Sequence, residues 1–180
     1  MRSLGLFVAT TPTWDKIASE KLTEREIQKQ YIFPWISICV FFVFVFEGLY
    51  APQKGLETGF IKAIITAVSF LGSYFLSNKI CFWYLRNQHP DMSSALDCEK
   101  IVSYSFTTMF VLKVFTTVLP SLFFLQILSV FTAYLIWEGC RAVLNMNEEE
   151  RGNIVLVFTS VIILSPIIIS QIIYLMLPNV

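Results

Sequence analysis

Four charged side chains stand inside stretches of the sequence that are otherwise apolar. Glu47 directly follows the run FFVFVF, and Lys113 lies within a second apolar stretch. Glu138 and Arg141 lie one helical turn apart in a third. A charge at the lipid-facing centre of a bilayer costs at least about 2.5 kcal/mol, so such residues usually face a protein interior or a water-filled cavity. These four are therefore candidate functional residues, as structural ion pairs or as groups lining a path.

The spacing of these residues predicts how they pair. At a rise of about 1.5 Å per residue, Glu47 and Lys113 lie about 24 and 18 Å from the same membrane face, so their side chains can meet. Lys62 begins the neighbouring span and is the alternative partner of Glu47, although its position at the water edge lets it reach outward. Glu138 and Arg141 are expected to form an i to i+3 pair that faces the bundle.

Patterns typical of catalysis or metal binding are missing from the sequence. The only histidine, His89, stands beside a proline in a polar segment, and no Gly-x-Ser-x-Gly or His-Glu-x-x-His motif is present. The four cysteines have no Cys-x-x-Cys spacing. We therefore expect a protein that is not an enzyme, with no catalytic residues, no cofactor and no metal site.

The elements that position the charges are membrane-spanning helices. The 180 residues are 56% hydrophobic and only 14% charged, which leaves too little polar surface for a soluble domain. The net charge is zero, so no nucleic-acid partner is expected, and the lipid bilayer is the expected environment. Runs of 18 or more apolar residues predict an all-α, polytopic bundle of five transmembrane helices in residues 30–178, with spans near 31–50, 60–85, 101–119, 122–144 and 154–177.

Residues 1–29 are predicted to form an N-terminal arm with an amphipathic helix on the membrane surface. Trp14, Ile17 and Leu22 fall on one arc of a helix, and Lys21 on the same arc can extend its amine toward lipid head groups. The alternative is a helix packed on loops of the protein itself. Thr23 and Glu26 match a capping box, which predicts the start of the next helix.

The distribution of basic residues predicts the orientation. Ten of the 13 Lys and Arg residues lie in the arm or border the second and fourth loops, whereas Lys54 and Lys62 lie near the first loop. Basic residues concentrate on the cytoplasmic side, so the N-terminus is expected in the cytoplasm and the C-terminus outside. Ser69, Ser73 and Ser77 recur every four residues of the second span, which predicts close packing of another helix.

Three motifs resemble one family of five-span membrane proteins. Pro12, Trp14 and Ile17 match a pattern before the first span, VSYSF at 102–106 resembles a Tyr-Ser motif in the third, and AYLIWEGCRAV followed by EEERG resembles the fourth. This combination is similar to the Yip domain family, which is named for an interaction with Ypt and Rab GTPases. The proline that commonly follows Tyr-Ser is absent here. The resemblance implies a bacterial-type member, in the bacterial inner membrane.

Two functions follow from these observations. The resemblance implies a non-enzymatic integral membrane protein that acts by protein or lipid interaction in membrane organisation or trafficking-like roles. Its contacts would be the N-terminal helix and the loop 86–100, and its partner a membrane protein or a second copy of the chain. The alternative is a small oligomeric transporter or channel whose intramembrane charges line a path.

Overall fold

The predicted five-helix architecture is confirmed. The structure is a computed structural model of the chain that describes residues 10–50, 55–90 and 94–177, and every element in these ranges is helical. Within them, five helical segments are long and apolar enough to cross a membrane: Glu24–Leu49, Leu56–Gln88, Ala95–Val118, Pro120–Leu144 and Glu148–Met176. Several helices begin before their apolar stretches, because a helix starts at its cap whereas hydropathy marks only the part in lipid.

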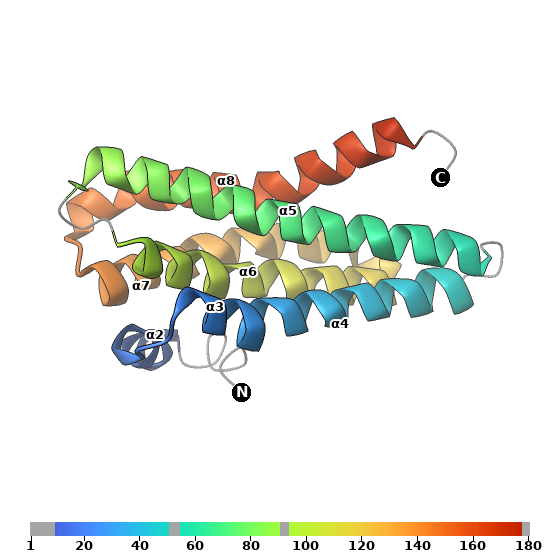
Figure 1. Cartoon of the computed structure of the whole chain (residues 1–180), viewed down its shortest axis with the longest axis horizontal. Coiled ribbons are helices and arrows are strands. Elements are labelled where there is room, and N and C mark those ends of the chain that lie inside the picture. Colours follow the sequence, from blue (N-terminus) through green and yellow to red (C-terminus); the bar gives the residue numbers. More distant parts are fainter. Residues whose placement is uncertain (1–9, 51–54, 91–93, 178–180) are drawn as a thin grey trace.

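The five segments run back and forth as an antiparallel bundle (Figure 1). Helix α2 (Thr10–Ser19) lies beside one end of this bundle, which we call the α2 end. The end of α5 (Leu56–Gln88), the start of α6 (Ala95–Val118), the end of α7 (Phe131–Leu144) and the start of α8 (Glu148–Met176) also lie there. The opposite end is called the far end.

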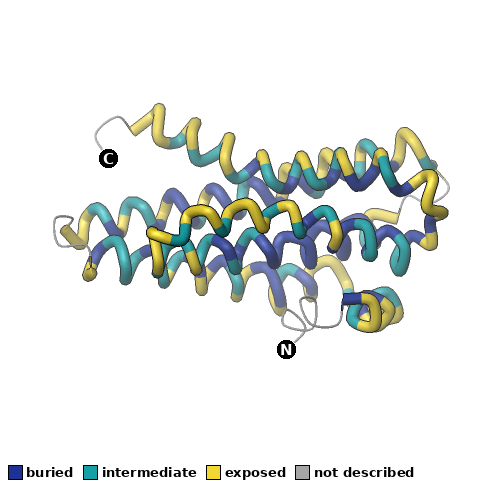
Figure 2. The backbone as a smooth tube through the Cα atoms, turned by 180° about the vertical axis from the view of Figure 1, so that it is seen from behind, coloured by how far each residue is buried: buried dark blue, intermediate teal, exposed yellow. Residues whose placement is uncertain are grey.

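Helix α6 is the centre of the bundle. It packs against α4 (Phe33–Phe44), α5, α7, α8 and the 3-10 helix η4 (Pro120–Val130) that precedes α7. Every residue from 98 to 108 is buried, although this stretch contains several hydroxyl side chains. Figure 2 shows the buried positions gathered on the inner faces of the helices. Polar side chains of α6 must therefore find partners within the protein.

The first membrane segment is irregular at two places. Its start is capped as predicted, since the backbone N–H of Thr23 donates to the Glu26 carboxylate at 2.8 Å. After α3 (Glu24–Ile27) comes a π-helical turn, η1 (Gln28–Ile32), just before Pro34, and a wider turn relieves the clash of a proline ring with the preceding carbonyls. A second π-helical turn, η2 (Val45–Leu49), follows α4 and carries Glu47.

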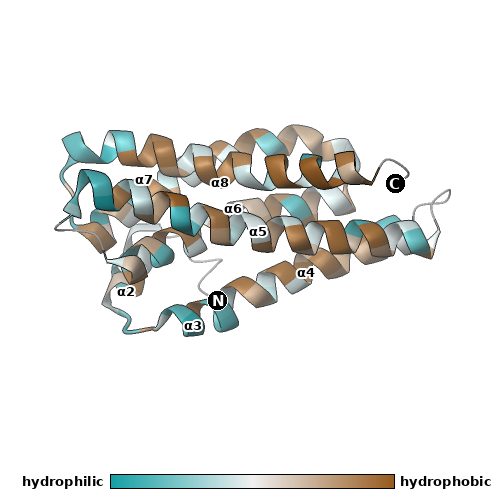
Figure 3. Ribbon diagram, turned by 45° about the horizontal axis from the view of Figure 1, so that its top comes forward, coloured by the Kyte–Doolittle hydropathy of each residue, from teal (hydrophilic) through white to brown (hydrophobic). Residues whose placement is uncertain are grey.

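The outer surface suits a lipid environment. Large apolar side chains such as Phe41, Phe75, Leu156 and Ile168 are exposed around the bundle. Figure 3 shows hydrophobic residues along the middle of the long helices and hydrophilic residues toward the α2 end and at the start of α5. This distribution is that of an integral membrane protein.

The predicted small-residue packing joins α5 to α8. Ser73 and Ser77 are fully buried, and the hydroxyl of Ser77 lies 3.0 Å from that of Ser165 on α8. Pro166 follows directly, and beyond it α8 diverges from α5 toward the far end (Figure 1). Proline removes one helix hydrogen bond, which permits this change of direction.

Candidate functional site

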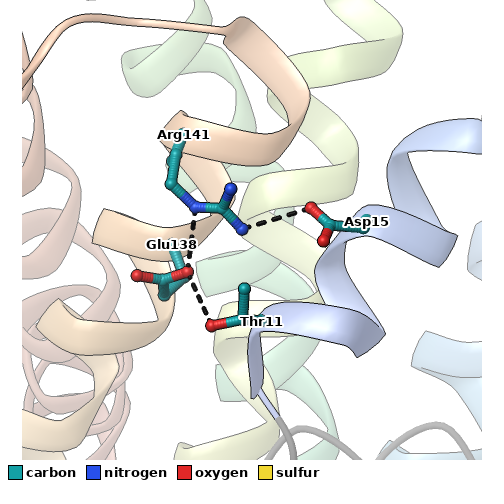
Figure 4. A network of polar contacts seen from close by, with 4 residues as sticks. All are labelled: Thr11, Asp15, Glu138 and Arg141. Carbon is teal, nitrogen blue, oxygen red and sulfur yellow. Dashed lines mark hydrogen bonds and ion pairs between the residues drawn. The ribbon is translucent and has the colours of Figure 1, made fainter.

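The predicted pair of Glu138 and Arg141 is present on α7. Arg141 Nε donates to Glu138 Oε2 at 3.1 Å. The pair also connects two elements (Figure 4): Arg141 Nη2 binds Asp15 Oδ1 on α2 at 3.1 Å, and the Thr11 hydroxyl donates to Glu138 Oε2 at 3.1 Å. The sequence predicted a contact within one helix. In the structure the same two residues also bind α2 and so attach it to the bundle.

Trp14 provides the apolar half of this attachment. Its side chain is fully buried, and its ring lies 6.0 Å from the ring of Tyr104 on α6 in an edge-to-face arrangement. The indole also covers Gly139 on α7, where a Cβ would be 3.0 Å from Cη2. A glycine at this position of α7 therefore leaves the space that the indole occupies.

The prediction that Trp14 and Ile17 contact the membrane surface is wrong. Trp14 and Ile17 are 0% and 2% exposed, respectively, because the apolar face of α2 packs against α7 and the bundle. Helical periodicity identifies an apolar face but not what covers it, and here the protein itself covers it, through helices α6 and α7 rather than through the loops that the alternative named. Lys21 and Leu22 lie beyond the end of α2; Lys21 is exposed and Leu22 half-buried, and their contact with lipid stays a prediction.

Glu47 pairs with Lys62, and the favoured pairing with Lys113 is wrong. Lys62 Nζ donates to Glu47 Oε2 at 2.7 Å, with both side chains partly exposed. The backbones of η2 and α5 touch beside this pair, since a Cβ on Gly59 would be 2.4 Å from Gly48 Cα. Counting residues predicts only a depth along the membrane normal and does not show which helix lies beside Glu47. The contact between Gly48 and Gly59 brings η2 close to α5.

Lys113 occupies a separate environment. Glu47, Lys62 and Cys39 lie near enough to influence its charge, but none of them forms an ion pair with its amine. It lines a cavity of about 330 Å³ at the far end, between α5, α6, η4 and α8. Polar side chains contribute to the lining, among them Thr66, Ser69, Gln126, Ser129 and Ser170.

Two buried charges on α6 were not identified from the sequence as candidate sites. Glu99 and Lys100 on α6 are 6% and 4% exposed. Gln28 Nε2 donates to Glu99 at 2.8 Å, the Tyr74 hydroxyl also donates to it, and Lys100 Nζ donates to the Ala18 carbonyl at 3.3 Å. The signal that could have found them is Ser94, the N-cap residue of α6, because a helix that begins there contains both residues.

Further contacts stabilise the α2 end. The guanidinium of Arg151 lies 5.0 Å from the centre of the Trp137 ring, which joins α8 to α7. All four cysteines are buried and free. Over the described ranges, no group of three or more His, Cys, Asp or Glu side chains could hold a metal ion.

Comparison with known proteins adds one finding. The family model described as the Yip1 domain matches residues 4–177, which is nearly the whole chain and confirms the resemblance of the three sequence motifs. No curated protein and no solved structure matches the chain.

Proposed function

Since the chain belongs to the Yip1 domain family, we propose that this integral membrane protein acts without catalysis, by binding a protein partner at its α2 end. Such binding would serve membrane organisation or trafficking-like roles. The partner is a second membrane protein, a membrane-associated protein or another copy of the chain.

The docking of α2 is the observation that carries this proposal. Trp14 fixes the apolar face of α2 on α7, and Asp15 is held by Arg141. The opposite face, with Pro12, Lys16 and Ser19, is exposed. A surface held in one conformation loses less entropy when a partner binds, so the docked helix offers a preorganised contact site.

The proposed orientation places this site in the cytoplasm, in a bacterial inner membrane. The support is the excess of Lys and Arg at the α2 end, although Arg2 and Lys54 lie outside the described residues. The four native cysteines are buried, so an impermeant thiol reagent should report mainly on introduced ones. Arg86→Cys should be labelled only from the cytoplasmic side and Lys54→Cys only from outside; the reverse pattern would invert the orientation.

Photo-crosslinking in the native membrane tests the function. A photoreactive amino acid at Lys16, on the exposed face of α2, should give a defined protein adduct. The matched control at Leu156, an exposed apolar position on α8, should give mainly lipid adducts. Lipid adducts alone at Lys16 would contradict the proposal. Proteoliposomes that move ions or solutes at a rate dependent on Glu47 or Lys113 would instead favour the transporter.

A further inference from the structure

Among the described residues, the membrane segments near the far end carry two acidic side chains, Glu47 and Glu57, and two basic ones, Lys62 and Lys113; Glu57 is exposed at the start of α5. Glu47 is already bound by Lys62 at 2.7 Å. Lys113, by contrast, has neither an ion pair nor a hydrogen bond from its amine within the part of the chain that the structure describes. Cys39, which also influences Lys113, donates its thiol hydrogen to the Phe110 carbonyl and is therefore uncharged. A cation at this depth is stabilised by an anion in direct contact, and Lys113 has none among the described residues.

The cavity beside Lys113 has room and hydrogen-bonding groups for such an anion. Its volume of about 330 Å³ falls within the range of roughly 300–1,000 Å³ typical of small-ligand sites. Ser69 is 4% exposed, and its hydroxyl is buried without a hydrogen-bond partner. Thr66, Gln126 and Ser129 add further polar groups to the lining. A buried hydroxyl without a partner is costly, so a ligand that accepts from it gains binding energy.

The position of the cavity gives access from the lipid. Helix η4 packs mainly on α6, and α8 diverges from α5 beyond Pro166. The outer side of the cavity therefore lies between η4 and this last part of α8. Gln126 and Ile167 belong to its lining and are also exposed on the outer surface. The surface around this opening is apolar, with exposed side chains such as Ile127 and Ile168.

We propose that this cavity binds the anionic head group of a phospholipid, whose phosphate pairs with Lys113 while its acyl chains lie against η4 and α8. A phosphate presents several acceptor oxygens, which suit an ammonium group together with hydroxyl and amide donors. The apolar surface at the opening matches acyl chains, which a free anion lacks. The site lies at the far end, so it does not depend on protein binding at the α2 end.

Native mass spectrometry of the detergent-purified protein tests this site. With short-chain phosphatidylglycerol, the wild type should retain one tightly bound lipid, and Lys113→Met should weaken its affinity by about tenfold or more. Lys113→Arg should keep most of it. The matched control is Lys79→Met, which removes an exposed lysine at the α2 end and should bind as the wild type does. Ser129→Phe, which fills the cavity and retains Lys113, should also weaken binding, and this variant serves if Lys113→Met does not fold.

Two comparison ligands identify the source of the anion. Phosphatidylcholine should bind more weakly than phosphatidylglycerol, and inorganic phosphate should not compete at equal concentration. Equal binding of phosphatidylglycerol to the wild type and to both Lys113→Met and Ser129→Phe would overturn the proposal. Effective competition by inorganic phosphate would overturn the assignment to a lipid.

Discussion

The six-membered ring of Trp14 lies directly against Gly139, so that a Cβ on this glycine would be 3.0 Å from Cη2 and 3.1 Å from Cζ2 of the indole. The contact joins the N-terminal helix to the fourth membrane segment. It places a large aromatic side chain in the protein interior rather than at the lipid surface. The position of α2, and with it the proposed partner site, depends on this pair and on the polar contacts of Arg141.

Substitution of Gly139 should release α2. Gly139→Leu adds a side chain where the Trp14 ring lies, so the ring must move and the helix should leave its site. Tryptic cleavage after Lys16 should then become faster in detergent. Gly152→Leu is the matched control, because nothing lies within 4 Å of a Cβ at Gly152. Equal cleavage rates in the two variants would show that α2 does not rest on Gly139.

The polar contacts between α2 and α7 should differ in strength. Asp15 is 56% exposed, so Asp15→Asn should cost less than about 1 kcal/mol in unfolding free energy. The Glu138 side chain is 13% exposed and accepts from both Arg141 and Thr11, so Glu138→Gln should cost about 1–3 kcal/mol. Melting in detergent measures both. An Asp15→Asn effect larger than that of Glu138→Gln would contradict this order.

The contact between Gly48 and Gly59 should not tolerate a methyl group. Gly59→Ala would place a carbon 2.4 Å from Gly48 Cα, so η2 and α5 must separate at a cost of about 1–3 kcal/mol or more. The melting temperature should fall clearly. Gly152→Ala, with open space at its Cβ, should be neutral or slightly stabilising. If the two alanine variants melt alike, the backbones do not touch at Gly59.

Much of the fold could be predicted from the sequence because its determinants are local or depend on composition. Apolar runs identified five spans, and the i to i+3 spacing identified the pair of Glu138 and Arg141. The cap at Thr23 was also identified from its own sequence neighbourhood. Each of these features depends on residues near one another in the chain.

The remaining parts depend on contacts between distant segments. The amphipathic pattern of α2 is the same whether lipid or protein covers it, so the burial of Trp14 was missed. The choice between Lys62 and Lys113 as the partner of Glu47 depended on how closely η2 approaches α5, which two glycines set. Glu99 is buried because α6 extends beyond its apolar stretch, which hydropathy alone does not reveal.

A double-mutant cycle should distinguish the two lysines near Glu47. Glu47→Gln and Lys62→Met remove the two partners of one ion pair, so their effects on unfolding should be non-additive by about 0.5–3 kcal/mol. Partial exposure of both side chains places the expected value toward the lower end. The coupling of Glu47→Gln with Lys113→Met should be smaller. Larger coupling with Lys113 would restore the pairing that depth alone had favoured.

Fluorescence quenching by brominated lipids tests the docking of α2 most directly. The measurement uses a variant in which Trp14 is the sole tryptophan, reconstituted in bilayers, and a matched variant that retains only Trp83, which is 65% exposed on α5. Bromine on acyl chains quenches an indole that contacts lipid. Docking predicts strong quenching of Trp83 and little quenching of Trp14. If Trp14 is quenched as strongly as Trp83, α2 lies in the membrane surface and the proposed partner site is not formed.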